Sequence, residues 1–278
     1  MSQQLTIEVE GGLLCRAITS DGSVRVIGVR AEEAAAELKK AHGLSGDAAD
    51  IAAEGLVATA LMAAHIKGPE RMTLQIQSSK PVLSFYAEIS SDGAVRGRLK
   101  PPRVVAPHRK LNGVLLAIKA NEDRELYRGV TEVSDQTLTE ALRGHLSDSA
   151  QIDSLLSIAD GAGLLIERLP DSDGSHVLSV DAFNTRYGGL VDEPPGEVVE
   201  ALTAGKLGDD EVVMLSMRSV FWQCRCSDER VLGMLATLDA DTLRDMIETD
   251  GGAEVICHFC NHPYAVGVEG LKSLLSPN

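Results

Sequence analysis

Four of the five cysteines in this 278-residue chain lie near its C-terminal end, in two closely spaced pairs. Cys224 and Cys226 form a C-x-C pair, and Cys257 and Cys260 form a C-x-x-C pair. Thiolates are soft ligands, and four of them complete a closed tetrahedral shell around one Zn²⁺ ion at about 2.3 Å from each sulfur. The spacing therefore predicts one zinc site with no open coordination position, and hence no Lewis-acid catalysis.

Two other interpretations of the cysteines remain open at this point. Most closed four-cysteine sites are structural, so the segment is alternatively a zinc-ribbon binding module. However, the gap at 227–256 is longer than the roughly 15–20 residues of common ribbons, and the first pair is C-x-C. The other alternative is a thiol–disulfide oxidoreductase that uses Cys257 and Cys260. Such a pair normally begins a helix that follows a strand, whereas Pro263 stands close behind this one.

The remaining reactive residues do not predict a second site. His258 and His262 flank Cys260, but four thiolates already complete a tetrahedral shell, so we expect neither histidine to bind the metal. Cys15 is a lone cysteine, and we expect it to be a small buried hydrophobic side chain. The sequence contains no H-E-x-x-H, G-x-G-x-x-G or P-loop motif, so we predict no catalytic residue and no enzyme.

The charge of the chain excludes further classes of function. Its formal net charge is −15, and residues 221–278 contain four Lys/Arg and nine Asp/Glu. Nucleic acids and anionic membranes bind basic surfaces, so neither is an expected partner. The apolar stretch at 55–64 is too short to span a bilayer, and the first residues show no secretory signal. We therefore expect a cytoplasmic protein, whose paired cysteines bind metal or react with oxidants and do not form permanent disulfides.

Helices and strands must position the cysteines. The first group of these helices and strands is predicted before residue 170. Asp21-Gly22 predicts the turn of a hairpin, and Gly43 predicts the end of a helix. The expected elements are a hairpin at 13–30, helices at 31–43, 47–68 and 136–147, and strands at 72–77, 82–89, 94–99, 113–120, 126–133 and 161–169. This mixture predicts an α+β domain of sheet and helices over residues 1–170.

Two further parts follow this domain. Residues 171–219 place Pro, Gly and Asp between short apolar stretches, so we expect a metastable linker with marginal helices. Residues 220–278 are then a small zinc-binding domain, and zinc contributes about 10–16 kcal/mol to the folding of such a segment. Within it, Ser227 and Asp239 are expected to cap two short helices.

The residues around the cysteines resemble the heat shock protein 33 family of redox-regulated chaperones. The similar segments are CRCSDER at 224–230, DGGAEVICHFC at 250–260 and HIKGPERMTLQIQ at 65–77, and the resemblance runs through the whole chain. It implies that the four paired cysteines bind Zn²⁺ in a reduced, inactive state. It also implies that oxidation forms the disulfides Cys224–Cys226 and Cys257–Cys260, releases zinc, and unfolds the zinc domain and the linker. The product would be an ATP-independent holdase, homodimeric when active, that binds unfolding client proteins.

Local disulfides would affect stability differently from the metal. Each closes a very short loop and constrains the unfolded chain little, whereas loss of the metal removes the link across residues 227–256. Oxidation is therefore expected to destabilise the segment and to expose its apolar surface, which is a chaperone-like output. The chain departs from the family pattern at Pro263 and in its Pro- and Gly-interrupted linker. We expect these departures to alter the oxidant threshold of the switch and to leave its ligands unchanged.

Overall fold

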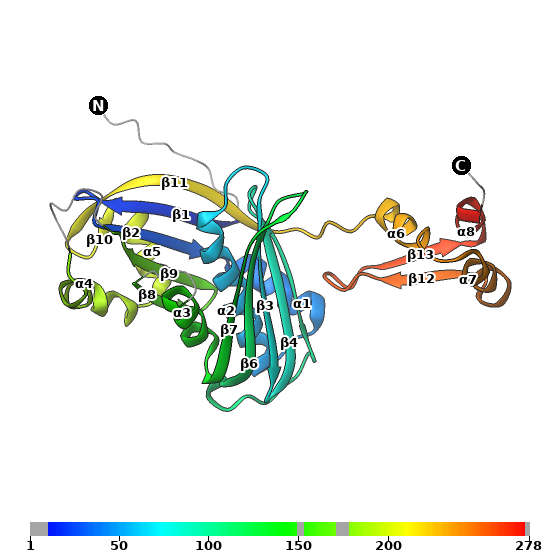
Figure 1. The fold of residues 1–278 in the computed structure, drawn as a ribbon, viewed down its shortest axis with the longest axis horizontal. Coiled ribbons are helices and arrows are strands. Elements are labelled where there is room, and N and C mark those ends of the chain that lie inside the picture. The colour runs from blue at the N-terminus through cyan, green and yellow to red at the C-terminus, as the bar shows by residue number, and fades with distance from the viewer. Residues whose placement is uncertain (1–10, 149–152, 171–177, 276–278) are drawn as a thin grey trace. The chain divides into compact units, whose positions relative to one another are not determined.

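The computed structural model of the chain describes residues 11–148, 153–170 and 178–275. The chain divides into two compact units, Met1–Gln223 and Cys224–Asn278 (Figure 1). The first unit contains a large mixed sheet with helices packed against it, and the second contains a two-stranded sheet with short helices. The α+β class predicted from the sequence is confirmed.

One 11-stranded sheet organises the first unit. Its strands are β1 (Gly12–Thr19), β2 (Val24–Arg30), β3 (Arg71–Ser79), β4 (Val82–Ser90), β5 (Ala94–Lys100), β6 (Leu111–Ala120), β7 (Glu125–Gln136), β8 (Ser154–Ala159), β9 (Ala162–Arg168), β10 (Lys206–Leu207) and β11 (Asp210–Trp222). The strand order is β7-β6-β3-β4-β5-β11-β1-β2-β9-β8, and β10 pairs with β11. β11 pairs antiparallel with β1 and, at Phe221 and Trp222, parallel with β5, so it joins the two halves of the sheet.

The helices of the first unit are α1 (Glu32–His42), α2 (Asp47–Met62), α3 (Leu138–Asp148), α4 (Val180–Tyr187) and α5 (Pro195–Thr203), with 3-10 turns η1 (Ala63–His65), η2 (Pro107–Arg109) and η3 (Gly188–Val191). α1 ends as predicted at Gly43, whose φ of 59° places it in the left-handed region. α2 is buried along almost its whole length and packs against β3, β4 and β5. No helix in the described part of the chain is long and apolar enough to cross a bilayer.

The predicted hairpin at 13–30 is formed by β1 and β2, and its turn is held by one side chain. Asp21 Oδ1 accepts hydrogen bonds from the Thr19 hydroxyl at 2.6 Å and from the Ser23 N–H at 3.0 Å. Gly22 has a φ of 74°, which favours glycine. The predicted strands at 72–77, 82–89 and 94–99 are β3, β4 and β5, so the sequence located this part of the sheet correctly.

Residues 178–222 form more regular structure than the sequence predicted. The expected marginal helices are α4 and α5, but the strand β11 was missed, because DEVVMLSMRSVFW shows no strict alternation of apolar and polar residues. This region contributes to a second apolar core, where Phe183, Tyr187 and Val199 pack with Cys15 and Leu164. β8 was also missed. The first seven residues of the expected linker, 171–177, lie outside the described residues.

The second unit consists of short elements around a small core. They are α6 (Asp228–Leu235), α7 (Ala240–Asp245), the π-helical turn η4 (Met246–Asp250), β12 (Gly252–Ile256), β13 (Pro263–Gly267) and α8 (Val268–Leu275). The predicted caps are confirmed: the Ser227 side chain accepts from the Arg230 N–H at 3.2 Å, and Asp239 accepts from the N–H groups that begin α7. The buried residues of this core are Val231, Leu235, Leu243, Tyr264 and Leu271.

Candidate metal centre

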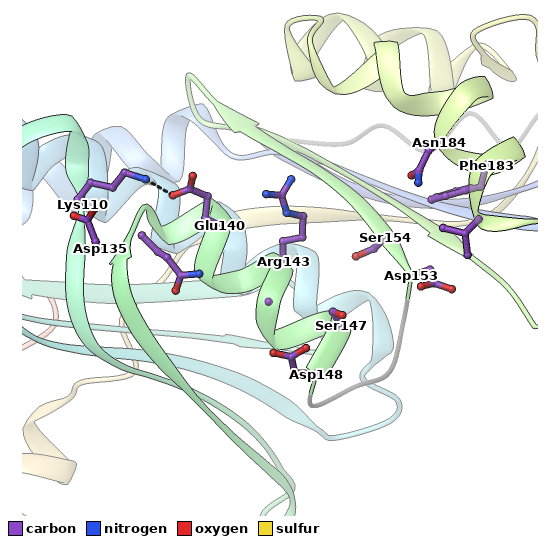
Figure 2. Close-up of a pocket in the computed structure, with 13 residues that line it drawn as sticks. Lys110, Asp135, Glu140, Arg143, Ser147, Asp148, Asp153, Ser154, Phe183 and Asn184 are labelled. Atoms are coloured by element: carbon purple, nitrogen blue, oxygen red, sulfur yellow. Dashed lines mark hydrogen bonds and ion pairs between the residues drawn. The ribbon is translucent and has the colours of Figure 1, made fainter.

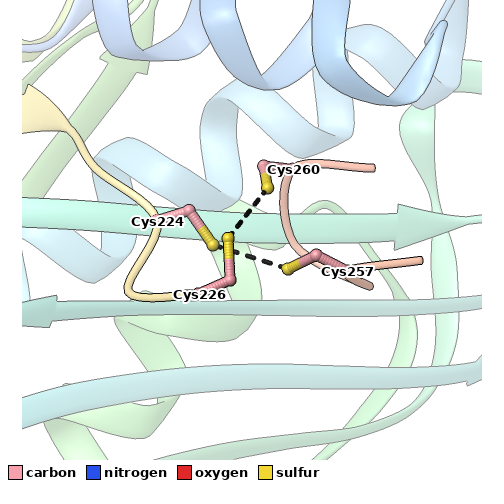
Figure 3. A group of neighbouring side chains, drawn as sticks. All are labelled: Cys224, Cys226, Cys257 and Cys260. Carbon is pink, nitrogen blue, oxygen red and sulfur yellow. Dashed lines mark hydrogen bonds between the residues drawn. The ribbon is translucent and has the colours of Figure 1, made fainter. Parts of the chain in front are cut away.

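The four paired cysteines of the second unit come together in space (Figure 3). Cys224 and Cys226 lie in the extended segment before α6, and Cys257 and Cys260 lie in the turn between β12 and β13. Cys224 Sγ is 3.6 Å from Cys257 Sγ, and Cys226 Sγ is 3.4 Å from Cys260 Sγ. All four sulfurs lie within 4.8 Å of one another, so residues far apart in the sequence form one cluster.

The dimensions of this cluster fit a tetrahedral metal site. Four sulfurs at about 2.3 Å from a central Zn²⁺ ion would be about 3.8 Å from one another, which lies between the observed contacts of 3.4–3.6 Å and the 4.8 Å limit. All four thiols are free and partly buried. Within the described residues, no other group of three or more His, Cys, Asp or Glu side chains has this potential. The donor set is therefore that of a soft, closed site, although the metal itself is not identified by the geometry.

The turn between β12 and β13 is built to present two sulfurs in one direction. The N–H of Asn261 donates to the Cys257 carbonyl at 2.8 Å, and the N–H of Cys257 donates to the His262 carbonyl at 3.0 Å. Asn261 has a φ of 56°, a left-handed conformation that asparagine tolerates better than most residues. The N–H of Phe259 is aimed at Cys257 Sγ at 3.5 Å. The backbone therefore fixes both cysteines and stabilises negative charge on sulfur.

Ionisation of the four thiols is strongly interdependent. Partial burial raises the pKa of Cys257, but hydrogen bonds from the N–H groups of Phe259 and Cys260 outweigh it and lower the value to about 7. Burial is the main cause of the raised pKa values of Cys224 and Cys260. Four thiolates this close repel one another, so they can ionise together only beside a cation. A divalent metal ion supplies that compensation, which agrees with the geometry of the cluster.

The other residues considered from the sequence lie outside the cluster. Neither His258 nor His262 belongs to the group of four sulfurs. The His262 ring instead packs edge-to-face on Tyr264, with centroids 4.8 Å apart. Cys15 is fully buried in the first unit, as expected, and burial raises the pKa of its thiol to about 11.

Sequence reasoning missed one buried residue beside the cluster. Tyr264 belongs to the small core of the second unit, and Cys226 and Cys257 pack against this core. Tyr264 is in β13, four positions after Cys260. No metal-ligand motif includes such a residue, so only its position shortly after the second cysteine pair hinted at this packing.

One cavity of the first unit, of about 500 Å³, is lined by charged side chains and is not a catalytic constellation (Figure 2). Its described lining residues include no cysteine or histidine. Glu140 bonds to Lys110 at 2.6 Å and accepts hydrogen bonds from the N–H and hydroxyl of Thr137. These partners lower the pKa of Glu140 to about 2, Lys110 contributing most. The arrangement is a helix cap for α3, which is a structural role.

Comparisons with known proteins place these observations in a family. The family model described as Hsp33 protein matches residues 12–267. The 33 kDa chaperonin of Gloeobacter violaceus is 30% identical, with 94% of each chain covered, and that of Shouchella clausii is 28% identical, with 94% of this chain and 96% of its own covered. The crystal structure of the 33 kDa chaperonin (heat shock protein 33 homolog) of Thermotoga maritima superposes with a TM-score of 0.76 at 24% identity. It covers 96% of this chain and 98% of its own, so the fold is shared over nearly the whole length.

Proposed function

The chain belongs to the Hsp33 family, and from this premise we propose that it is a redox-regulated, ATP-independent holdase chaperone. The observation that carries the proposal is the cluster of four free cysteines, whose sulfurs lie within 4.8 Å of one another. In the reduced state, Cys224, Cys226, Cys257 and Cys260 would hold one Zn²⁺ ion. Bound there, the ion would supply a cross-link between the two cysteine pairs.

That cross-link matters because the second unit has little core of its own. Among its described residues only five hydrophobic side chains are buried, and the two cysteine pairs are separated by the helices α6 and α7 and the strand β12. Small units of this kind usually need a metal or disulfides to fold. We infer that the metal-bound thiolates hold the unit folded and the chaperone inactive.

Oxidation would remove the ligands in two balanced steps for each disulfide. One thiolate attacks hydrogen peroxide: an S–O bond forms, the O–O bond breaks, and hydroxide leaves. A second thiolate attacks the resulting sulfenic sulfur, forming the S–S bond and expelling a second hydroxide. Each hydroxide takes a proton from solvent, so two thiolates lose two electrons and peroxide becomes two waters. The products we propose are Cys224–Cys226 and Cys257–Cys260, which leave no covalent link between the pairs.

The client-binding surface would come from residues 171–219, acting as a metastable linker. In the described part of this range, α4, α5 and β11 cover the second apolar core, which includes Phe183, Tyr187 and Leu202. Val213 and Leu215 of β11 are already about half exposed, at 55% and 48%. Release of these elements would expose a continuous apolar surface suited to unfolding proteins. We further propose that the active form is a homodimer and that the protein works in the cytoplasm, without nucleic-acid or membrane partners.

Light scattering tests the proposal. A chemically unfolded client protein is diluted into buffer with either the reduced, zinc-loaded chain or the chain oxidised by warm peroxide. Suppression of scattering by the oxidised chain alone supports the switch. Equal failure of both forms refutes it and leaves a structural zinc ribbon, whereas catalytic reduction of insulin would identify an oxidoreductase. Mass spectrometry of the oxidised chain checks the two disulfides, and light scattering after size exclusion checks the dimer.

A further inference from the structure

Two methionines of β11 face the second apolar core from the same side of the strand. Met214 and Met217 are partly buried and pack against this core, which also contains Cys15. Met217 lies opposite Cys15 of β1, and Met214 lies opposite Ala17. Residues three positions apart on a regular strand would point to opposite faces of the sheet. A local irregularity of β11 must therefore bring both sulfur-containing side chains to one face.

The irregularity is a β-bulge at Leu215. The register of β1 and β11 passes from Ser216 directly to Met214, so Leu215 is skipped, and its side chain is 48% exposed. The extra residue turns Met214 and Met217 to the same face, and it interrupts the ladder of hydrogen bonds between the two strands. The two methionines therefore lie at a weak point in the attachment of β11 to β1.

The partial exposure of Met214 and Met217 sets them apart from the other sulfur-containing side chains described in the first unit. Cys15 is 0% exposed, and Met62 and Met72 are 5% and 3% exposed. Met214 and Met217 lie instead at the rim of the second core and keep part of their surface accessible. An oxidant in solution can therefore reach these two thioethers while the first unit is folded.

We propose that Met214 and Met217 form a second oxidant-sensing site, which hydrogen peroxide modifies by transfer of one oxygen atom to each sulfur. The lone pair of the thioether sulfur attacks peroxide: an S–O bond forms, the O–O bond breaks, and hydroxide leaves. The hydroxide takes the proton of the transferred oxygen and becomes water. The sulfur is oxidised by two electrons to a sulfoxide, and peroxide is reduced to water.

The sulfoxides would weaken the packing that holds the elements of residues 178–222 on the first unit. A sulfoxide is polar, so its contact with the apolar core shared by α4, α5 and β11 becomes unfavourable. Thiol reductants return disulfides to thiols, whereas sulfoxides need dedicated reductases. The modification would therefore keep these elements easier to release after the four cysteines are reduced again. This inference rests on the proposed function and adds to it an effect of oxidation that outlasts the disulfides.

The double substitution Met214→Leu with Met217→Leu tests the site, because leucine keeps the volume and apolar character of the side chain and cannot be oxidised. The matched control is Met234→Leu, which replaces a 50% exposed methionine of the second unit. Each full-length chain is treated with warm peroxide and then with a thiol reductant and Zn²⁺, so that the cysteines are reduced and the sulfoxides remain. Tandem mass spectrometry locates the added oxygen, and limited trypsin digestion measures the rate of cleavage after Arg186 of α4.

We expect oxygen to be added at Met214 and Met217 and not at the buried Met62 and Met72. Digestion of a native protein follows the population of locally open chain, so cleavage after Arg186 should be about tenfold faster in the treated wild type than in the untreated chain. Treated Met234→Leu should match the treated wild type, and the double variant should show no increase. Methionine sulfoxide reductases should restore slow cleavage in the wild type, which also serves if the double variant folds poorly.

Three results would overturn the proposal. The first is absence of added oxygen at both methionines under conditions that oxidise the four paired cysteines. The second is equal acceleration of cleavage in the double variant and the wild type. The third is cleavage that stays fast after the reductases have removed the added oxygen. Neither readout involves a client protein, so failure of the oxidised wild type to suppress aggregation would refute the holdase function and leave the methionine result standing.

Discussion

The substitution Leu271→Ala tests whether the second unit depends on its small core as well as on metal. Leu271 lies in α8 and is completely buried among the apolar residues that surround Tyr264. Truncating a buried leucine to alanine costs about 2–5 kcal/mol of stability, because the removed methyl groups no longer contribute buried apolar surface and a cavity remains in their place. The core of this unit is small and can relax around the gap, so we expect the lower part of that range, about 2–3 kcal/mol.

This cost should appear in the zinc affinity. If the metal-free unit is unfolded, zinc binding includes the free energy of folding, so any loss of core stability weakens apparent binding by the same amount. A factor of ten corresponds to about 1.4 kcal/mol, and 2–3 kcal/mol therefore predicts roughly 30- to 150-fold weaker apparent binding. Structural zinc contributes about 10–16 kcal/mol, so the loaded variant should still fold.

Competition with a chelator of known affinity, under reducing conditions, measures the effect. Met234→Ala is the matched control, because Met234 is in the same unit but 50% exposed, and its affinity should stay within about threefold of the wild type. Leu271→Ala should also release zinc at lower peroxide concentrations than the wild type. An unchanged affinity in Leu271→Ala would mean that the metal-free unit is already folded, and coupling of metal binding to folding would be refuted.

Three further predictions concern both units. Chelator treatment of the reduced chain should abolish the helical signal of the second unit, and a circular dichroism spectrum that the chelator leaves unchanged would contradict this. Gly55→Ala places a Cβ atom 2.4 Å from the Phe85 ring and should destabilise the first unit by about 1–3 kcal/mol in denaturant melts, whereas Gly233→Ala meets no atom within 4 Å and should be neutral or stabilising. Burial raises the pKa of Glu54 to about 7 in the folded chain, despite its ion pair with Arg109. In the unfolded chain the pKa of a glutamate is about 4.3. The protonated side chain therefore contributes stability that is fully present below about pH 4.3 and is lost as the pH rises through about 7. Glu54→Gln should therefore gain stability relative to wild type between about pH 5 and pH 8, and urea melts across that range that show no relative gain would contradict the reasoning.

The cysteine cluster could be predicted from the sequence because it depends on residue type and on short spacings along the chain. Few residue types bind soft metals, and a spacing of one or two residues allows both sulfurs of a pair to reach one metal ion. The helix caps at Ser227 and Asp239 were predictable for a similar reason, since each depends on residues within one helical turn. Such features need no knowledge of the rest of the fold.

The features that sequence analysis missed depend on pairing between distant residues. β11 is a strand because it finds β1 and β5, which lie far away in the chain, and its own residues carry almost no alternating pattern. The burial of Tyr264 in the core that Cys226 and Cys257 pack against depends on the register of β12 and β13, which places Tyr264 opposite Val255. A shift of one residue would turn the tyrosine to the other face of the hairpin. Register is a property of the folded hairpin and cannot be read from cysteine spacing.

The position of β11 explains how loss of metal in one unit would act on the other through the chain itself. Trp222 ends the strand, and Gln223, whose N–H donates to the Val95 carbonyl at 3.0 Å, is the last residue before Cys224. At this end β11 is held to β5 by the pairing at Phe221 and Trp222 and by the hydrogen bond of Gln223. If Cys224 is freed from the cluster, the chain directly after β11 is no longer held in place. The short parallel pairing between β11 and β5 is then the first part of the sheet to be weakened. Its loss would separate β11 from one half of the sheet, and the remaining attachment, to β1, contains the register shift at Arg16 and Ala17. Oxidation of a few sulfur atoms would in this way reach the apolar core beneath α4 and α5.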